Sequence, residues 1–124
     1  MLPVRVLLVD DDTLVRRAVR QILEAADDLE VVGEASDGDG AVRQAPQADV
    51  VLMDLRMPVL DGFEAIRRLK SSSDTRDIPV LAVTAQAMDE DREHCLALGV
   101  DGFITKPIDL EIFQKKIEEV LGIQ

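Results

Sequence analysis

Aromatic residues and cysteines are scarce in this chain of 124 residues, which has three phenylalanines, one cysteine, no tryptophan and no tyrosine. No Trp or Tyr could stack on a flavin ring, and no Ser/Thr/Gly-rich phosphate loop follows the first apolar run, so flavin binding is disfavoured. A single cysteine cannot form an internal disulfide, which is typical of proteins in a reducing compartment. Because Cys95 falls on the apolar side of an expected helix, we predict a buried thiol with a structural role.

Basic residues and long apolar runs are also in short supply. The chain has 14 Lys and Arg against 25 Asp and Glu, a net charge of −11, whereas nucleic-acid binding needs clustered cations. No apolar run approaches the ~20 residues of a membrane span, and no export signal is visible. We therefore predict a cytoplasmic protein that binds neither nucleic acid nor membrane. Its length predicts one domain over residues 1–124, with no effector domain.

Five short apolar runs recur along the chain, at residues 4–9, 30–35, 50–53, 80–83 and 102–104. All but the second and fifth are nearly continuous in Val, Leu, Ile and Met, which is typical of parallel strands covered on both faces. Helical segments separate them, and this alternation implies right-handed crossovers. We therefore predict an α/β fold, a single doubly wound (βα)5 flavodoxin-like domain whose parallel five-stranded sheet has the order 2-1-3-4-5.

Three of the helices have clear sequence signals. Apolar residues recur at three- and four-residue steps through residues 15–26, and Asp12 is the expected N-cap of this first helix. Asp61 and Glu64 resemble a capping box that opens the third helix. The last helix is expected over residues 110–121.

Polar side chains gather where the predicted strands end. Asp10 and Asp11 follow the first strand, Asp54 the third, Thr84 the fourth and Lys106 the fifth. In this topology those ends share one rim of the sheet. Carboxylates ~4 Å apart repel by about 4 kcal/mol at an effective dielectric constant near 20, and a divalent cation reverses that sign. Such oxygen ligands suit Mg²⁺, and an aspartate can attack phosphorus to give an aspartyl phosphate.

Four sequence blocks carry a resemblance to a known family: VLLVDDDTLVRR, VVLMDLRMPVLDG, LAVTA and DGFITKP. In order and spacing they resemble the signature blocks of response-regulator receiver domains of two-component signalling. The resemblance implies that Asp54 accepts a phosphoryl group from a histidine kinase or a histidine phosphotransfer protein. It also implies that Asp10, Asp11 and Asp54 hold Mg²⁺, with the main-chain carbonyl of Arg56 as a further ligand.

The same resemblance assigns roles around the phosphoryl group. Thr84 matches the switch hydroxyl of the family, and Lys106 matches its phosphate-binding lysine. Phe103 matches an aromatic residue that rotates inward as the hydroxyl moves, but it lacks a phenol, so a switch here would work by packing. The family commonly has a cis peptide before the proline that corresponds to Pro107. Its output usually leaves through the face of helix 4, strand 5 and helix 5, here toward an unknown target.

The segment 88–98 has a helical pattern with little apolar character, because Cys95, Leu96 and Leu98 are the main apolar residues on its apolar side. It is either a loosely packed, solvated helix or part of that output face, and the sequence leaves both open. His94 lies on its polar side and is expected to be solvated.

Two other functions are not excluded by the residues. Phosphatases of the haloacid dehalogenase type use D-x-D followed two residues later by Thr or Val, and residues 10–14 come close but end in Leu14. In such an enzyme Asp10, not Asp54, would be phosphorylated. A pseudo-receiver that acts as an interaction module without phosphorylation typically lacks a site residue, whereas this chain keeps all five. We predict a phosphorylation-dependent switch that is not an enzyme on external substrates.

Overall fold

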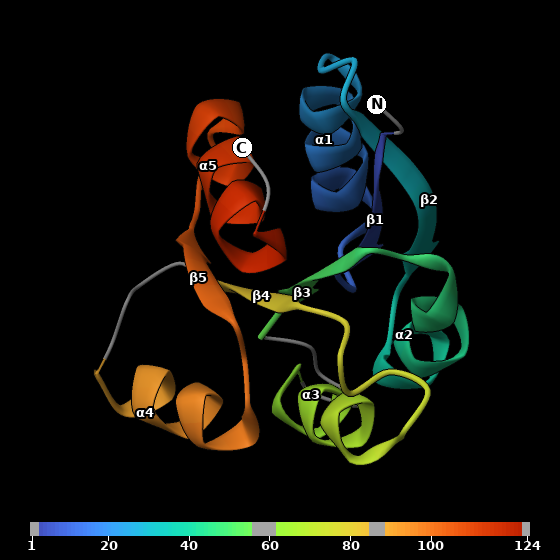
Figure 1. Cartoon of the computed structure of the whole chain (residues 1–124). Helices are drawn as coiled ribbons and strands as arrows, with labels where there is room; N and C mark the ends of the chain where they lie inside the picture. Colours follow the sequence, from blue (N-terminus) through green and yellow to red (C-terminus); the bar gives the residue numbers. More distant parts are fainter. Residues whose placement is uncertain (1–2, 56–61, 85–88, 123–124) are drawn as a thin grey trace.

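Strands and helices alternate in the computed structural model, which describes residues 3–55, 62–84 and 89–122 (Figure 1). The strands are β1 (Val4–Val9), β2 (Leu29–Ala35), β3 (Val50–Asp54), β4 (Val80–Thr84) and β5 (Gly102–Thr105). The helices are α1 (Thr13–Glu24), α2 (Gly38–Gln44), the short 3-10 helix η1 (Ala45–Gln47), α3 (Gly62–Ser71), α4 (Asp89–Leu98) and α5 (Leu110–Leu121). Every predicted strand lies within an observed strand, and β3, β4 and β5 each end one residue later than predicted.

The five strands form one parallel sheet in the order β2-β1-β3-β4-β5, as predicted. The chain moves outward from β1 to β2 and then returns to place β3 on the other side of β1. The order therefore reverses between β1 and β3. In open α/β sheets, ligands bind outside the carboxyl ends of the strands at such a switch point.

Helices cover both faces of the sheet, with α1 and α5 on one face and α2, α3 and α4 on the other (Figure 1). The alternation of side chains along each strand divides the core into two clusters. The cluster under α1 and α5 includes Leu8, Leu52 and Phe113. The cluster under the other three helices includes Met53 and Ile66. Because both of their faces are buried, the central strands β3 and β4 have no polar face, which explains their continuous apolar runs.

Capping residues start the helices on the α1 and α5 face. The Asp12 carboxylate accepts hydrogen bonds from the backbone N–H groups of Leu14 and Val15, which confirms its predicted role as the N-cap of α1. Asp109 caps α5 in the same way. The proposed capping box of α3 cannot be compared, because Asp61 lies outside the described residues.

Few of the side chains described on helix α4 are buried. Among the side chains described on it, those of residues 92–98, Cys95 alone is fully buried, as predicted for a structural thiol, and Leu96 is 54% exposed. His94 is exposed but not simply solvated, because its ring stacks on that of Phe63 in α3 at a centroid distance of 4.5 Å. This contact corrects the expectation that His94 is only hydrated. In the described part of the chain, no helix combines the length and apolar character of a membrane span.

Candidate functional site

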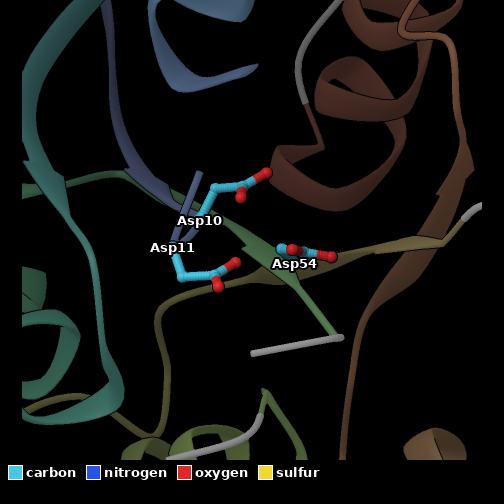
Figure 2. A group of neighbouring side chains, drawn as sticks. All are labelled: Asp10, Asp11 and Asp54. Carbon is cyan, nitrogen blue, oxygen red and sulfur yellow. The ribbon is translucent and has the colours of Figure 1, made fainter. Parts of the chain in front are cut away.

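Three aspartates meet at the carboxyl ends of β1 and β3 (Figure 2). Asp10 and Asp11 directly follow β1, and Asp54 is the last residue of β3. One carboxylate oxygen from each residue lies within 4.8 Å of the others. Asp10 and Asp54 are only 8% and 5% exposed, whereas Asp11 is exposed. The structure thus brings together three of the residues that the sequence places at the sheet rim.

The three carboxylates form a donor set that fits a hard divalent cation. Oxygen ligands of Mg²⁺ lie about 2.1 Å from the ion, so opposite ligands of an octahedron are about 4.2 Å apart. The separations of up to 4.8 Å between the oxygens of Asp10, Asp11 and Asp54 are close to that value. Small side-chain rotations would bring all three into the range of one ion. The main-chain carbonyl of Arg56, the fourth expected ligand, lies outside the described residues.

Lys106 places an ammonium group beside two of the aspartates. Its Nζ lies 3.7 Å from Asp10 Oδ2 and 3.7 Å from Asp54 Oδ1. The backbone N–H of Lys106 donates to the carbonyl of Thr84, so the end of β4 fixes the position of this loop. The peptide bond between Lys106 and Pro107 is cis, as the resemblance implies. One cation therefore faces the buried carboxylates and reduces their mutual repulsion.

Thr84 and Phe103 lie toward the face of the sheet that α2, α3 and α4 cover. Thr84 ends β4 in register with Thr105, and Phe103 is a neighbour of Ala82 in the same ladder. By the two-residue alternation of strands, Thr84 shares the face of Ala82, and Phe103 packs on the same cluster. Thr84 is 7% exposed and Phe103 is half-buried. The two expected switch residues thus belong to the α4 side.

Arg92 of α4 lies over the ring of Phe103, with the guanidinium carbon 4.9 Å from the ring centroid. This is a cation–π geometry. The sequence did not suggest this contact, because helical periodicity says nothing about which long side chain reaches across to a neighbouring strand.

Asp10 is held by three hydrogen bonds that the sequence did not reveal. Its N–H donates to the carbonyl of Ala35, and its Oδ1 accepts from the N–H of Asp12 at 2.9 Å. Its carbonyl accepts a 2.6 Å hydrogen bond from Nη1 of Arg16 in α1. Backbone and side chain of Asp10 are therefore fixed before any ligand binds.

Gly62 brings the start of α3 against the backbone of the phosphoacceptor candidate. A Cβ at this position would lie 2.5 Å from the carbonyl oxygen of Asp54 and 2.6 Å from Cα of Leu55. The N–H of Gly62 donates to the carbonyl of Leu55. No side chain fits there, so glycine allows the helix to begin directly beside the site.

Glu34 is the charged group that connects β2 to α1 near the site. Hydrogen bonds from Arg20 and then Arg16 hold the pKa of the Glu34 carboxyl below its usual value, against the opposing effect of burial. Glu34 is therefore ionised throughout the neutral range and balances part of the positive charge of the two arginines.

A sequence-family model for the response regulator receiver domain matches residues 6–118. The two-component response regulator ORR41 of Oryza sativa subsp. japonica is 39% identical over 112 residues, which cover 87% of this chain and 87% of that protein. The phosphate regulon transcriptional regulatory protein PhoB of Escherichia coli is 39% identical over 119 residues, 94% of this chain and 51% of that protein. A protein-glutamate methylesterase/protein-glutamine glutaminase of Methanococcoides burtonii is 37% identical, and the match covers 95% of this chain but 34% of the enzyme.

The chain is also similar in structure to solved receiver domains and chemotaxis proteins. The chemotaxis protein CheY4 of Vibrio cholerae superposes with a TM-score of 0.85 at 32% identity, covering 95% of this chain and 98% of that one. The receiver domain of the sensor histidine kinase PA1611 of Pseudomonas aeruginosa, solved with a magnesium ion coordinated in its active-site cleft, has a TM-score of 0.85 at 33% identity. That match covers 97% of this chain and 98% of the other. Several curated relatives are longer proteins, of which this chain spans a third to a half.

Proposed function

Because the chain belongs to the family of response regulator receiver domains, we propose that Asp54 is its phosphoacceptor. Receiver domains are phosphorylation-dependent signalling switches, and this chain is one of them. The observation that carries the assignment of Asp54 is its place at the end of β3, 5% exposed, with Asp10 and Asp11 within 4.8 Å and Lys106 at 3.7 Å. Asp10 lies equally close to Lys106, so the choice of Asp54 over Asp10 is supported by the match of the block VVLMDLRMPVLDG to the signature of the family, in which Asp54 has the place of the phosphoacceptor.

Phosphoryl transfer needs a nucleophile, neutralisation of the phosphoryl charge and a leaving group. An Asp54 oxygen forms the new bond to phosphorus, and the bond from phosphorus to the donor's histidine nitrogen breaks. The electron pair of that bond stays on the imidazole, which takes up a proton. Lys106 balances charge on the phosphoryl oxygens, and Asp10 and Asp11 would hold a Mg²⁺ ion. Mg²⁺, when bound, supplies the remaining positive charge at the transferring group.

We propose that the signal is read out through the expected switch pair, Thr84 and Phe103. Thr84 donates its hydroxyl to a phosphoryl oxygen on Asp54, and Phe103 fills the space that the threonine side chain leaves. Since Phe103 has no hydroxyl, the change is transmitted by packing. The face of α4, β5 and α5 then presents a different surface to a downstream partner.

The donor is a histidine kinase or a histidine phosphotransfer protein. Receiver domains work with such proteins in a cytoplasmic setting, and we propose the same location for this chain. Residues 1–124 form a single receiver domain. The domain assists its own phosphorylation and does not turn over an external substrate. The methylesterase relatives are enzymes, but the match with this chain covers only about a third of the Methanococcoides protein.

Intact mass spectrometry after incubation with acetyl phosphate tests the assignment. We expect the wild-type protein to gain one phosphoryl group in the presence of Mg²⁺ and little without it. Asp54→Asn should not gain the group, whereas Asp12→Asn, which changes an acid of the helix cap, should. Peptide mapping of the acyl phosphate gives the position of the modification. Phosphorylation at Asp10 would support the phosphatase alternative, and equal modification of Asp54→Asn would overturn our assignment.

A further inference from the structure

Arg16 makes a bridge between the acidic cluster and β2. Its side chain is only 13% exposed. One guanidinium nitrogen, Nη1, donates to the carbonyl of Asp10 at 2.6 Å, and Nε lies 3.1 Å from Oε1 of Glu34. The planar guanidinium presents its donors in a fixed fork, so the two bonds fix each other's direction.

The far end of this bridge is itself immobilised. Arg20, one turn further along α1, donates to the second carboxylate oxygen of Glu34 at 2.6 Å. The carbonyl of Glu34 accepts a 2.8 Å hydrogen bond from Nε2 of Gln44 at the end of α2. Glu34 is thus fixed by both its side chain and its backbone, and it holds Arg16 in one position.

The near end of the bridge acts on the peptide that joins two of the aspartates. The Asp10 carbonyl belongs to the peptide unit between Asp10 and Asp11, and the plane of that unit sets the direction in which the Asp11 side chain leaves the backbone. Arg16, Asp10 and Asp54 also border one hollow of about 20 Å³, room for one water molecule. Arg16 therefore lies next to the two buried aspartates.

We propose that Arg16, fixed by Glu34, is a positioning residue that holds the Asp10–Asp11 peptide in the orientation in which both carboxylates reach one divalent cation. This inference rests on the proposed function, because it takes the aspartate cluster as the cation site. Arg16 does not touch the cation or the phosphoryl group and acts through the backbone of Asp10. Groups that orient metal ligands in this way commonly change metal affinity by about 10- to 100-fold when they are replaced.

Replacement by lysine separates positioning from charge. Lysine keeps the positive charge but has one nitrogen on a flexible stem, so it cannot reproduce the fork. We expect Arg16→Lys to weaken Mg²⁺ binding about tenfold in calorimetric titration of the metal-free protein. Glu34→Gln, which retains Arg16 but releases its anchor, should weaken binding by a smaller factor. Arg17→Lys is the matched control, since Arg17 is the exposed neighbour on the same helix, and it should bind as the wild type does.

If Arg16 only stabilised the fold, its replacement would change the free energy of unfolding but not the Mg²⁺ affinity. Urea unfolding without Mg²⁺ measures how much each substitution destabilises the fold, and the titration measures affinity of the folded protein. If Arg16→Lys lowers stability but binds Mg²⁺ within twofold of Arg17→Lys, the positioning role is wrong. If Arg16→Lys does not fold, Glu34→Gln decides the question in the same way, and unchanged affinity in that variant overturns the proposal.

The outcome is also distinguishable from failure of the proposed function. If wild-type protein binds Mg²⁺ and is phosphorylated on Asp54 while the Arg16 and Glu34 variants bind equally well, only the present inference fails. If wild-type protein neither binds Mg²⁺ nor is modified on Asp54, the proposed function itself fails.

Discussion

Helices α1 and α4 lie on opposite faces of the sheet and are attached to it in different ways. Around α1 the contacts are directional hydrogen bonds: Asp12 caps the helix, and Arg16 joins Asp10 to Glu34. Each helix has one fully buried side chain among its described residues, Leu23 on α1 and Cys95 on α4, but α4 adds two ring contacts at the surface in place of such hydrogen bonds. Hydrogen bonds fix direction and length, whereas ring contacts tolerate sliding. We therefore expect the α1 side, which carries the aspartate cluster, to be the more rigid one, and the α4 side, which faces the expected switch pair, to rearrange at lower energetic cost.

The largest effect is expected at Gly62, where α3 begins directly against the backbone of Asp54 and Leu55. Gly62→Ala places a Cβ 2.5 Å from the Asp54 carbonyl oxygen, and backbone cannot move aside as a flexible side chain can. We expect a loss of about 2 kcal/mol in the free energy of unfolding, measured by urea denaturation. The Mg²⁺ affinity should fall as well, because Asp54 is displaced.

A loss below about 0.5 kcal/mol at Gly62, within the range of ordinary surface substitutions, would mean that α3 shifts easily. The end of β3 would then be held less firmly by α3 than the structure indicates.

The second prediction concerns the charge of Lys106 beside the aspartate cluster. Among the described residues, Lys106 forms the ion pairs with the carboxylates of Asp10 and Asp54, and it would compete with a metal ion for the same oxygens. Lys106→Gln should therefore raise the Mg²⁺ affinity about fivefold, a change of ~1 kcal/mol for a partly exposed pair. Titration calorimetry measures it. Lys115→Gln, an exposed lysine of α5 with the same charge change, controls for net charge and should have little effect.

A third and smaller effect is expected for the contact between α4 and β5, on the face of the sheet that is expected to rearrange. Arg92 and Phe103 form the contact between α4 and β5. A double-mutant cycle of Arg92→Gln and Phe103→Leu should give a coupling of about 0.5–1 kcal/mol in unfolding free energy, the usual value for an exposed cation–π pair. Mg²⁺ affinity should stay unchanged in all three variants. A change in Mg²⁺ affinity would show that α4 is coupled to the proposed metal site in the unphosphorylated protein, and the expected independence of α4 from that site would be wrong.

The smallest effect is the pH dependence of an exposed ion pair on α3. A hydrogen bond from Arg67 lowers the pKa of Glu64 to about 2. Because this pKa is depressed in the folded state, the pair stabilises the fold above the unfolded value of 4.5, and that contribution is lost as the pH falls toward 2. Glu64→Gln should therefore show a shallower loss of stability than the wild type between pH 4.5 and 2, measured by thermal unfolding. Parallel curves would indicate that solvent screening removes the contribution.

The positions of the site residues were predictable because they depend on topology. Continuous apolar runs indicated buried parallel strands, and the carboxyl ends of such strands share one rim. Asp10, Asp11 and Asp54 therefore had to come together once the strand order was right. The place of Lys106 beside them followed from the end of the fifth strand at the same rim, and its distances to the two carboxylates agree with that expectation.

Contacts between side chains of different elements could not be predicted in the same way. The hydrogen bond from Arg16 to Asp10, the stacking of His94 on Phe63 and the position of Arg92 depend on rotamers and on the crossing of helices over strands. Helix α2 also had no clear signal, because its first turn contains Gly38 and its apolar side is short. Periodicity identifies elements with a long apolar stripe, and it says little about long polar side chains.

The reaction rate of Cys95, the single cysteine of the chain, can measure how often α4 separates from the sheet. Cys95 has no exposed surface, and no second cysteine competes with it for a reagent. An alkylating reagent can react only during the moments when α4 is lifted from the sheet, so the labelling rate counts those openings. Comparing this rate before and after treatment with acetyl phosphate would time the motion of the helix, with no probe added to the protein.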